Sequence, residues 1–157
     1  MKRAEDIHLG RWVGMLYRRR DIYFDHQLQP YGIGPGQYRI LRILYHRLTA
    51  HNEAALNQQA IAREVNLDKA AVTRSLKKLE TQGFIRRHRS AEDGREFCVE
   101  LTPKARRLED TMWKIRHRWS EILGKGLTLQ EQKTASELMA RMAANTDEFL
   151  NAQRKCP

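Results

Sequence analysis

Apolar residues recur every three or four positions along most of this chain of 157 residues, and that is the spacing of one face of an α-helix. The pattern predicts helices over 7–28, 35–48, 58–65, 69–82, 103–123 and from 129 onward. Side chains whose oxygens can cap a first helical turn stand before four of them: Asn57, Asp68, Thr102 and Thr128. Proline and glycine separate the first two helices, and the polar stretch 49–55 is predicted to be a loop.

The pattern changes after Gly83, where two short runs with apolar and basic residues indicate strands over 84–89 and 96–101. The segment between them contains Asp93-Gly94, a strong signal for a tight turn. Two short helices, followed by two strands joined by a basic loop, have the order of a helix-turn-helix with a wing. The helix over 69–82 then occupies the place of the recognition helix.

The positive charge of the chain is concentrated in this same segment. Lysine and arginine total 29 against 19 aspartate and glutamate residues, so the formal net charge is +10. Between Lys69 and Arg89, Glu80 is the single acidic residue among many cations, whereas residues 108–157 are nearly neutral. Concentrated positive charge is the electrostatic footprint of polyanion binding, and nucleic acid is the first candidate.

The helix over 69–82 carries side chains suited to DNA on the side opposite its apolar residues. Ala70 is small enough to let the backbone approach the bases, and Thr73 and Arg74 can reach base edges in the major groove. Lys77 and Lys78, further along, are suited to phosphates. The alternative is a solvated helix face, since lysine and arginine are good helix formers. The residues expected to bind DNA are Asn57, Gln58, Lys69, Ala70, Thr73, Arg74, Lys77, Lys78, Arg86, Asp93 and Arg95.

The turn of the wing offers one more cation for DNA. Arg95 follows the flexible Gly94 and can enter the minor groove, whose negative potential attracts arginine. The alternative is that Arg95 is solvated or forms a salt bridge with Asp93, and the two roles are compatible.

Several motifs of the middle segment resemble those of a known family. They are Leu67-Asp68-Lys69 leading into Val72-Thr73-Arg74, Leu79-Glu80 leading to Gly83-Phe84-Ile85-Arg86-Arg87, Asp93-Gly94-Arg95 in the wing, and Leu101-Thr102-Pro103 after it. These motifs resemble the MarR family of winged-helix transcriptional regulators. The stretch Gly34-Pro35-Gly36-Gln37-Tyr38 is similar to the start of the family's second helix, so the resemblance covers nearly the whole chain.

The resemblance implies a mainly α fold with a small β-wing. A winged helix-turn-helix domain over 34–102 would lie between an N-terminal dimerisation helix within 1–33 and C-terminal dimerisation helices over 103–157. It also implies a homodimer that binds a palindromic operator in double-stranded DNA, as a repressor. The sequence supports a dimer independently, because a heptad-like series would leave an exposed apolar stripe in a monomer: Leu108, Met112, Ile115, Trp119 and Ile122.

Many proteins of this kind bind a small aromatic or phenolic anion that releases them from DNA. Trp12, Tyr38 and Trp113 are the candidates for such a ligand pocket. The alternative, that these aromatic rings pack in the core or the dimer interface, is the commoner role for aromatic residues at helical spacing.

The sequence contains no arrangement of residues that indicates an enzyme. It lacks a serine–histidine–acid order, a glycine-rich phosphate loop and paired carboxylates, so we expect neither a catalytic site nor a cofactor. The six histidines lack the spacing of metal ligands, so no metal site is expected. Cys98 is either a small residue of the wing or a redox-sensitive thiol. Without a long apolar run or a signal sequence, we expect a cytoplasmic protein with no membrane partner.

Two other classes of function remain open at this point. The chain could be an architectural or RNA-binding basic protein, which recognises shape and shows little preference among duplexes. It could also be a sensor that uses the fold for partner binding alone, although the concentrated charge argues against this third function.

Overall fold

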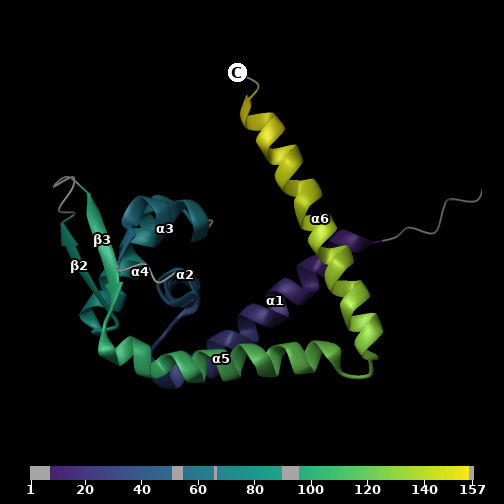
Figure 1. Ribbon diagram of the computed structural model, residues 1–157, viewed down its shortest axis with the longest axis horizontal. Coiled ribbons are helices and arrows are strands. Elements are labelled where there is room, and N and C mark those ends of the chain that lie inside the picture. Colours follow the sequence, from purple (N-terminus) through teal and green to yellow (C-terminus); the bar gives the residue numbers. More distant parts are fainter. Residues whose placement is uncertain (1–7, 51–54, 66, 90–95, 156–157) are drawn as a thin grey trace, which may run out of the picture. The chain divides into compact units, whose positions relative to one another are not determined.

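The computed structural model describes residues 8–50, 55–65, 67–89 and 96–155, and it is mostly helical with a small sheet (Figure 1). Its elements are α1 (Leu9–Leu28), the 3-10 turn η1 (Gln29–Tyr31), α2 (Pro35–Ala50), β1 (Leu56–Asn57), α3 (Gln58–Val65), α4 (Lys69–Thr81), β2 (Ile85–Arg89), β3 (Phe97–Leu101), α5 (Pro103–Gly124) and α6 (Leu129–Lys155). This order confirms the predicted mainly α fold with a small β-wing.

The chain divides into two compact units, Met1–Arg116 and His117–Pro157. The first unit contains the helix-turn-helix, the sheet, α1 and the start of α5. The second contains the end of α5 and α6. The division into segments 1–33, 34–102 and 103–157 concerns roles in dimerisation and DNA binding, and it stays a prediction.

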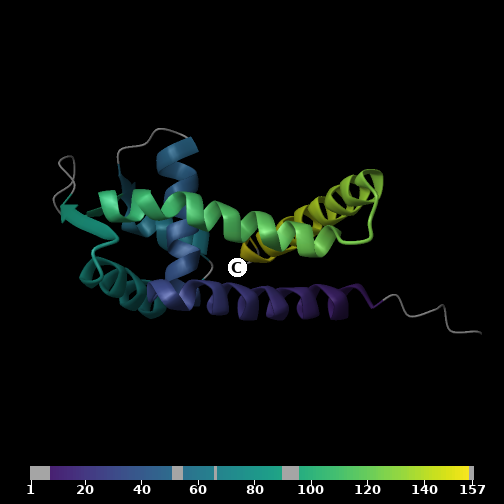
Figure 2. The ribbon, with the colours of Figure 1, turned by 90° about the horizontal axis from the view of Figure 1, so that it is seen from below.

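The core of the first unit is built around α2. Ile40, Leu41 and Leu44 are completely buried, and α2 contacts α1, α3, α4 and β3. The five residues that helical spacing predicts for its inner face are all buried: Tyr38, Leu41, Leu44, Tyr45 and Leu48. Seen from below, this unit has the strands at one end, with α1 running away from them (Figure 2).

The sheet has the order β1-β3-β2, with both neighbouring pairs antiparallel. Ile85 pairs with Leu101 and Arg87 with Val99, while β1 places Leu56 opposite Val99. The two long strands agree with the predicted wing. Strand β1 was not predicted, because two residues are too few to show an alternating pattern.

The prediction of a loop over 49–55 is wrong at its start, because α2 continues through Thr49 and Ala50. A polar residue does not by itself end a helix, and neither of these two positions holds a proline or glycine.

All four predicted helix caps are present. The side-chain oxygens of Asn57, Asp68, Thr102 and Thr128 accept hydrogen bonds from the amides of Gln59, Ala71, Ala105 and Glu131 at 2.7, 2.8, 3.3 and 3.3 Å. At the start of α6, the Glu131 carboxylate accepts a bond in return from the Thr128 amide at 2.7 Å, which completes a capping box. These bonds from Thr128 hold the pKa of Glu131 below its ordinary value.

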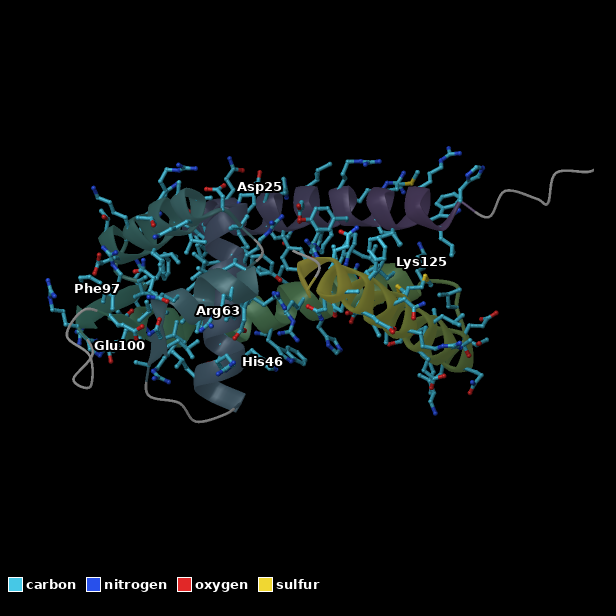
Figure 3. All side chains as sticks on the ribbon, turned by 90° about the horizontal axis from the view of Figure 1, so that it is seen from above. Asp25, His46, Arg63, Phe97, Glu100 and Lys125 are labelled. Atoms are coloured by element: carbon cyan, nitrogen blue, oxygen red, sulfur yellow. The ribbon has the colours of Figure 1, made fainter. Side chains whose placement is uncertain are left out.

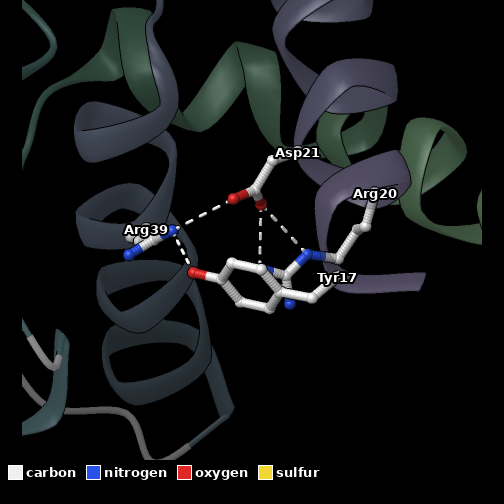
Figure 4. A network of polar contacts seen from close by, with 4 residues as sticks. All are labelled: Tyr17, Arg20, Asp21 and Arg39. Atoms are coloured by element: carbon white, nitrogen blue, oxygen red, sulfur yellow. Dashed lines mark hydrogen bonds and ion pairs between the residues drawn. The ribbon is translucent and has the colours of Figure 1, made fainter. Parts of the chain in front are cut away.

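Polar contacts join α1 to α2 within the first unit (Figure 4). The Arg39 guanidinium donates to the Tyr17 hydroxyl and, at 3.2 Å, to the Asp21 carboxylate. Arg20 donates to the same carboxylate at 2.9 Å, and its guanidinium carbon lies 4.4 Å from the centre of the Tyr17 ring. Two cations therefore share one carboxylate and one aromatic ring, and this arrangement fixes the middle of α1 against α2.

Candidate nucleic-acid interface

One side of α4 is apolar and buried and the other is polar and exposed, as a recognition helix requires. Val72, Leu76 and Leu79 are buried on its inner side. Asp68 caps its first turn, and Gly83 follows its last turn with a φ of 74°, a left-handed conformation that favours glycine. With both ends and the inner side fixed, the opposite side is exposed, and it carries Lys69, Ala70, Thr73, Arg74, Lys77 and Lys78.

A groove beside this exposed side brings together four of the residues predicted to bind DNA. It has a volume of about 540 Å³, and its walls come from the starts of α3 and α4 and from β3. We call it the α3–α4 groove. The predicted residues that line it are Asn57, Gln58, Lys69 and Thr73, which are separated by up to 16 positions in sequence.

The polar groups at the α3–α4 groove are partly engaged with one another. Asn57 uses its oxygen to cap α3, and its amide nitrogen donates to the Glu96 carboxylate. The Thr73 hydroxyl donates to the Lys69 carbonyl at 2.8 Å and keeps its oxygen lone pairs as acceptors. The Gln58 Oε1 atom is buried and accepts no hydrogen bond from the described residues. The groove therefore combines donors, acceptors and the Lys69 cation near the expected position of DNA.

The sequence analysis missed several other residues that line the groove, among them Gln59, Arg63, Glu96 and Phe97. Gln59 and Arg63 are four positions apart on α3, so the helical spacing contained a signal for them. Phe97 is 42% exposed at the start of β3, with the Arg89 guanidinium carbon 5.5 Å from its ring centre. Figure 3 shows Arg63 on α3 and Phe97 on β3.

Arg86 lies apart from the other predicted DNA-binding residues. It lines a separate hollow of about 670 Å³ together with His88, Glu100, Lys104 and Arg107. Glu100 is its partner in the β2–β3 register. The predicted set is thus divided between the α4 side and the wing sheet. Asp93 and Arg95 lie outside the described residues.

One cation of the charged segment is neutralised inside the fold. Arg87 donates to the Glu80 carboxylate through Nε at 2.8 Å and also through Nη2, with both groups partly buried. These hydrogen bonds hold the pKa of Glu80 below its ordinary value. In contrast, Arg74, Lys77 and Lys78 form no side-chain ion pair with the described part of the chain, so their charges are available to a ligand.

Two of the three aromatic residues predicted for a ligand pocket share one hollow, of about 100 Å³. Tyr38 and Trp113 line it together with Arg42, His46 and Arg116. Burial raises the pKa of Tyr38, although the Arg42 and Arg116 charges act in the opposite direction. Trp12, 57% exposed on α1, is not among the residues that line this hollow.

The described residues contain no group of three or more histidine, cysteine, aspartate or glutamate side chains that could hold a metal ion. Within the same residues, no helix is both long enough and apolar enough to cross a bilayer. Cys98 is a free, half-buried thiol on β3, opposite His88.

Comparisons with known proteins identify the family. The sequence profile of the MarR family matches residues 33–97. The uncharacterized HTH-type transcriptional regulator YdgJ of Bacillus subtilis (strain 168) is 32% identical over 114 residues, which are 73% of this chain and 66% of that protein. The crystal structure of a MarR transcriptional regulator from Methanosarcina mazei Go1 matches with a TM-score of 0.81 and 30% identity, over 93% of this chain and 94% of that one.

A third comparison concerns the fold alone. A mutant MarR from E. coli, crystallised in complex with operator DNA, matches with a TM-score of 0.72 and 24% identity, over 88% of this chain and 95% of that one. The relatives are transcriptional regulators, which agrees with the expectation that this chain is not an enzyme. On the strength of the profile match, the 30% identity to the Methanosarcina protein and the shared winged fold, the chain belongs to the MarR family of DNA-binding transcriptional regulators.

Proposed function

We propose that this chain is a homodimeric repressor that binds a palindromic operator through α4 and is released by a small aromatic anion. The exposed side of α4 is the observation that carries the proposal, because it presents unpaired cations beside small and hydrogen-bonding side chains. Such a side fits the major groove, where arginine can read a base edge and lysines can bind phosphates. The E. coli MarR that was crystallised with operator DNA has the same fold, which supports the proposal.

Selection of genomic DNA fragments by the purified chain, at two salt concentrations, tests this function. We expect one palindromic sequence to be enriched at both, with half-sites about one helical turn apart. Binding to unrelated duplexes should be weaker and should fall steeply with salt. Equal binding to all duplexes would favour the architectural function, and a preference for RNA would favour the RNA-binding one. Transcription from the selected promoter should rise when the gene is deleted, whereas a fall would indicate an activator.

Within the heptad-like series, Leu108, Met112 and Ile115 are buried in the chain itself, so the series does not form the exposed stripe predicted from the sequence. The proposed dimer rests instead on exposed apolar side chains in the terminal helices. Leu9, Trp12 and Val13 on α1 are 51–57% exposed, and α6 exposes Phe149 and Leu150 at 61% and 51%. Large apolar side chains exposed on each of these helices favour contact with a partner. Light scattering should therefore report a mass near twice the 18.5 kDa of one chain at micromolar concentration. A mass of one chain under those conditions would contradict the proposed dimer.

The hollow between Tyr38 and Trp113 is the proposed effector site. Arg42 and Arg116 supply two positive charges against one carboxylate, Glu109, and the aromatic rings supply apolar surface, so a single-ring aromatic carboxylate is the matching chemistry. We expect benzoate to weaken operator binding by the native chain and to have less effect on the Arg116→Ala variant. Lys114→Ala, two positions away and not lining the hollow, is the control. An undiminished response to benzoate in Arg116→Ala would reject this site.

A further inference from the structure

Gln82, the C-cap of α4, forms hydrogen bonds with two other parts of the first unit. Its Nε2 donates to the Gly32 carbonyl at 2.8 Å, and its Oε1 accepts from the Gln37 amide. Its backbone carbonyl accepts from the Lys104 ammonium at 2.7 Å. The end of α4 is therefore bonded both to the turn between α1 and α2 and to the first turn of α5.

The two residues that form hydrogen bonds with the Gln82 side chain are themselves held in defined positions. Gln37 is only 3% exposed, and its Oε1 accepts from the Gly34 amide at 3.0 Å, so its side chain caps α2 while its nitrogen is directed to Gln82. Gly32 has a φ of 68°, and a Cβ atom there would lie 3.1 Å from the Gln82 Nε2. A donor and an acceptor thus stand in fixed positions, and a glutamine amide satisfies both of them.

These bonds supply a constraint that the apolar core does not. Burial of Leu76 and Leu79 holds α4 against the core, but the hydrophobic effect has no directional preference. Hydrogen bonds weaken steeply when their angles change, so they define where the end of the helix lies. Lys77 and Lys78, the proposed phosphate-binding residues, lie in the adjoining turns, and their positions depend on that end.

We propose that Gln82 is a positioning residue: it fixes the orientation of α4 relative to the α1–α2 turn, and thereby sets which half-site spacing the protein accepts. The inference rests on the proposed function, in which α4 reads DNA and α1 belongs to the dimer interface. Under this proposal, the Gln82 side chain transmits the geometry of the dimer to the reading helix. Gln82 itself contacts no base, and its effect on recognition is indirect.

The test compares Gln82→Met with the native chain on the selected operator and on versions with the half-sites one base pair closer or further apart. Methionine has a similar volume but loses both side-chain hydrogen bonds. We expect about tenfold weaker binding at the native spacing, because DNA binding must then order the end of α4 that the two hydrogen bonds had fixed, and a smaller difference among the three spacings. Thr81→Val, at the neighbouring position of α4, is the matched control. It removes a hydroxyl that donates to the Lys77 carbonyl of the same helix and lies outside the Gln82 network, so it should leave the spacing preference unchanged.

Gln37→Met removes the bond that the two glutamines share, and it should reduce the spacing preference in the same way. The double variant should lose less than the sum of the single losses, because both remove one interaction. If Gln82→Met does not fold, Gln37→Met alone decides the matter. An unchanged spacing preference in a folded variant would overturn the proposal, even if stability falls. Failure of the native chain to prefer any sequence would instead reject the proposed function.

Discussion

Arg74→Ala weakens binding to the selected operator by about 1–3 kcal/mol, and the loss is concentrated at one base pair. Arg74 is exposed on the outer side of α4, four positions after Ala70, whose small side chain lets the helix approach the bases. Because Arg74 has no ion pair with the described residues, DNA does not have to displace a partner from it. Dissociation constants on the operator and on single-base variants measure the effect.

Lys78→Ala is the matched control for this prediction. This variant loses one charge from the same exposed side, one turn further along the helix. Because Lys78 is the proposed phosphate contact, its loss should weaken binding to all DNA sequences alike. The slope of log K against log salt should fall by about 1. If Arg74→Ala also produced a uniform loss and a similar change of slope, Arg74 would be a phosphate contact and base reading would have to come from Lys69 or Thr73.

Local sequence signals were sufficient to predict α4 and its exposed side. The Asp68 cap, the Gly83 terminus and the apolar spacing of Val72, Leu76 and Leu79 all lie within sixteen residues of one another, and each appears in the structure where the sequence indicates it. When the cap, the apolar spacing and the residue at the end of a helix all indicate the same bounds, the local sequence is sufficient to specify that helix.

The hydrogen bonds and the groove that bring together residues far apart in the sequence could not be predicted. The hydrogen bonds of Gln82 to Gly32 and Gln37 span 50 and 45 positions. The α3–α4 groove requires Phe97 and Glu96 to lie beside the starts of two helices. Nothing in the neighbouring sequence of these residues indicates their partners, because the juxtapositions arise only when the helices pack around α2.

Part of the positive charge counted along the sequence is engaged within the fold. Arg87 is bound to Glu80, and Arg89 lies beside the Phe97 ring. Arg86 is in the separate hollow near Glu100. Among the described residues, the cations that share a surface with the recognition residues are those of α4 together with Arg63 of α3. We therefore expect these cations, rather than those of β2, to supply most of the electrostatic attraction.

Leu76→Ala lowers the free energy of unfolding by about 2–5 kcal/mol. Leu76 is completely buried on the inner side of α4, and α4 contacts α2, whose Leu41 and Leu44 are also completely buried. Removing three carbons there leaves a cavity that rigid helices fill only partly, so the cost includes lost contacts as well as lost burial. Urea denaturation measures the change, at one fixed protein concentration because the stability of a dimer depends on concentration.

Lys77→Ala, at the next position along the same helix, should weaken DNA binding and leave the stability of the fold almost unchanged, in contrast to Leu76→Ala. Its side chain is exposed and unpaired, so its unfolding free energy should stay within about 0.5 kcal/mol of the native value. Its operator affinity should nevertheless fall, and the salt dependence should weaken, because a phosphate contact is lost. One position thus controls stability and its neighbour controls binding. If both variants were equally destabilised, Lys77 would belong to the core, α4 would be rotated about its axis, and the DNA-facing side described for it would be wrong.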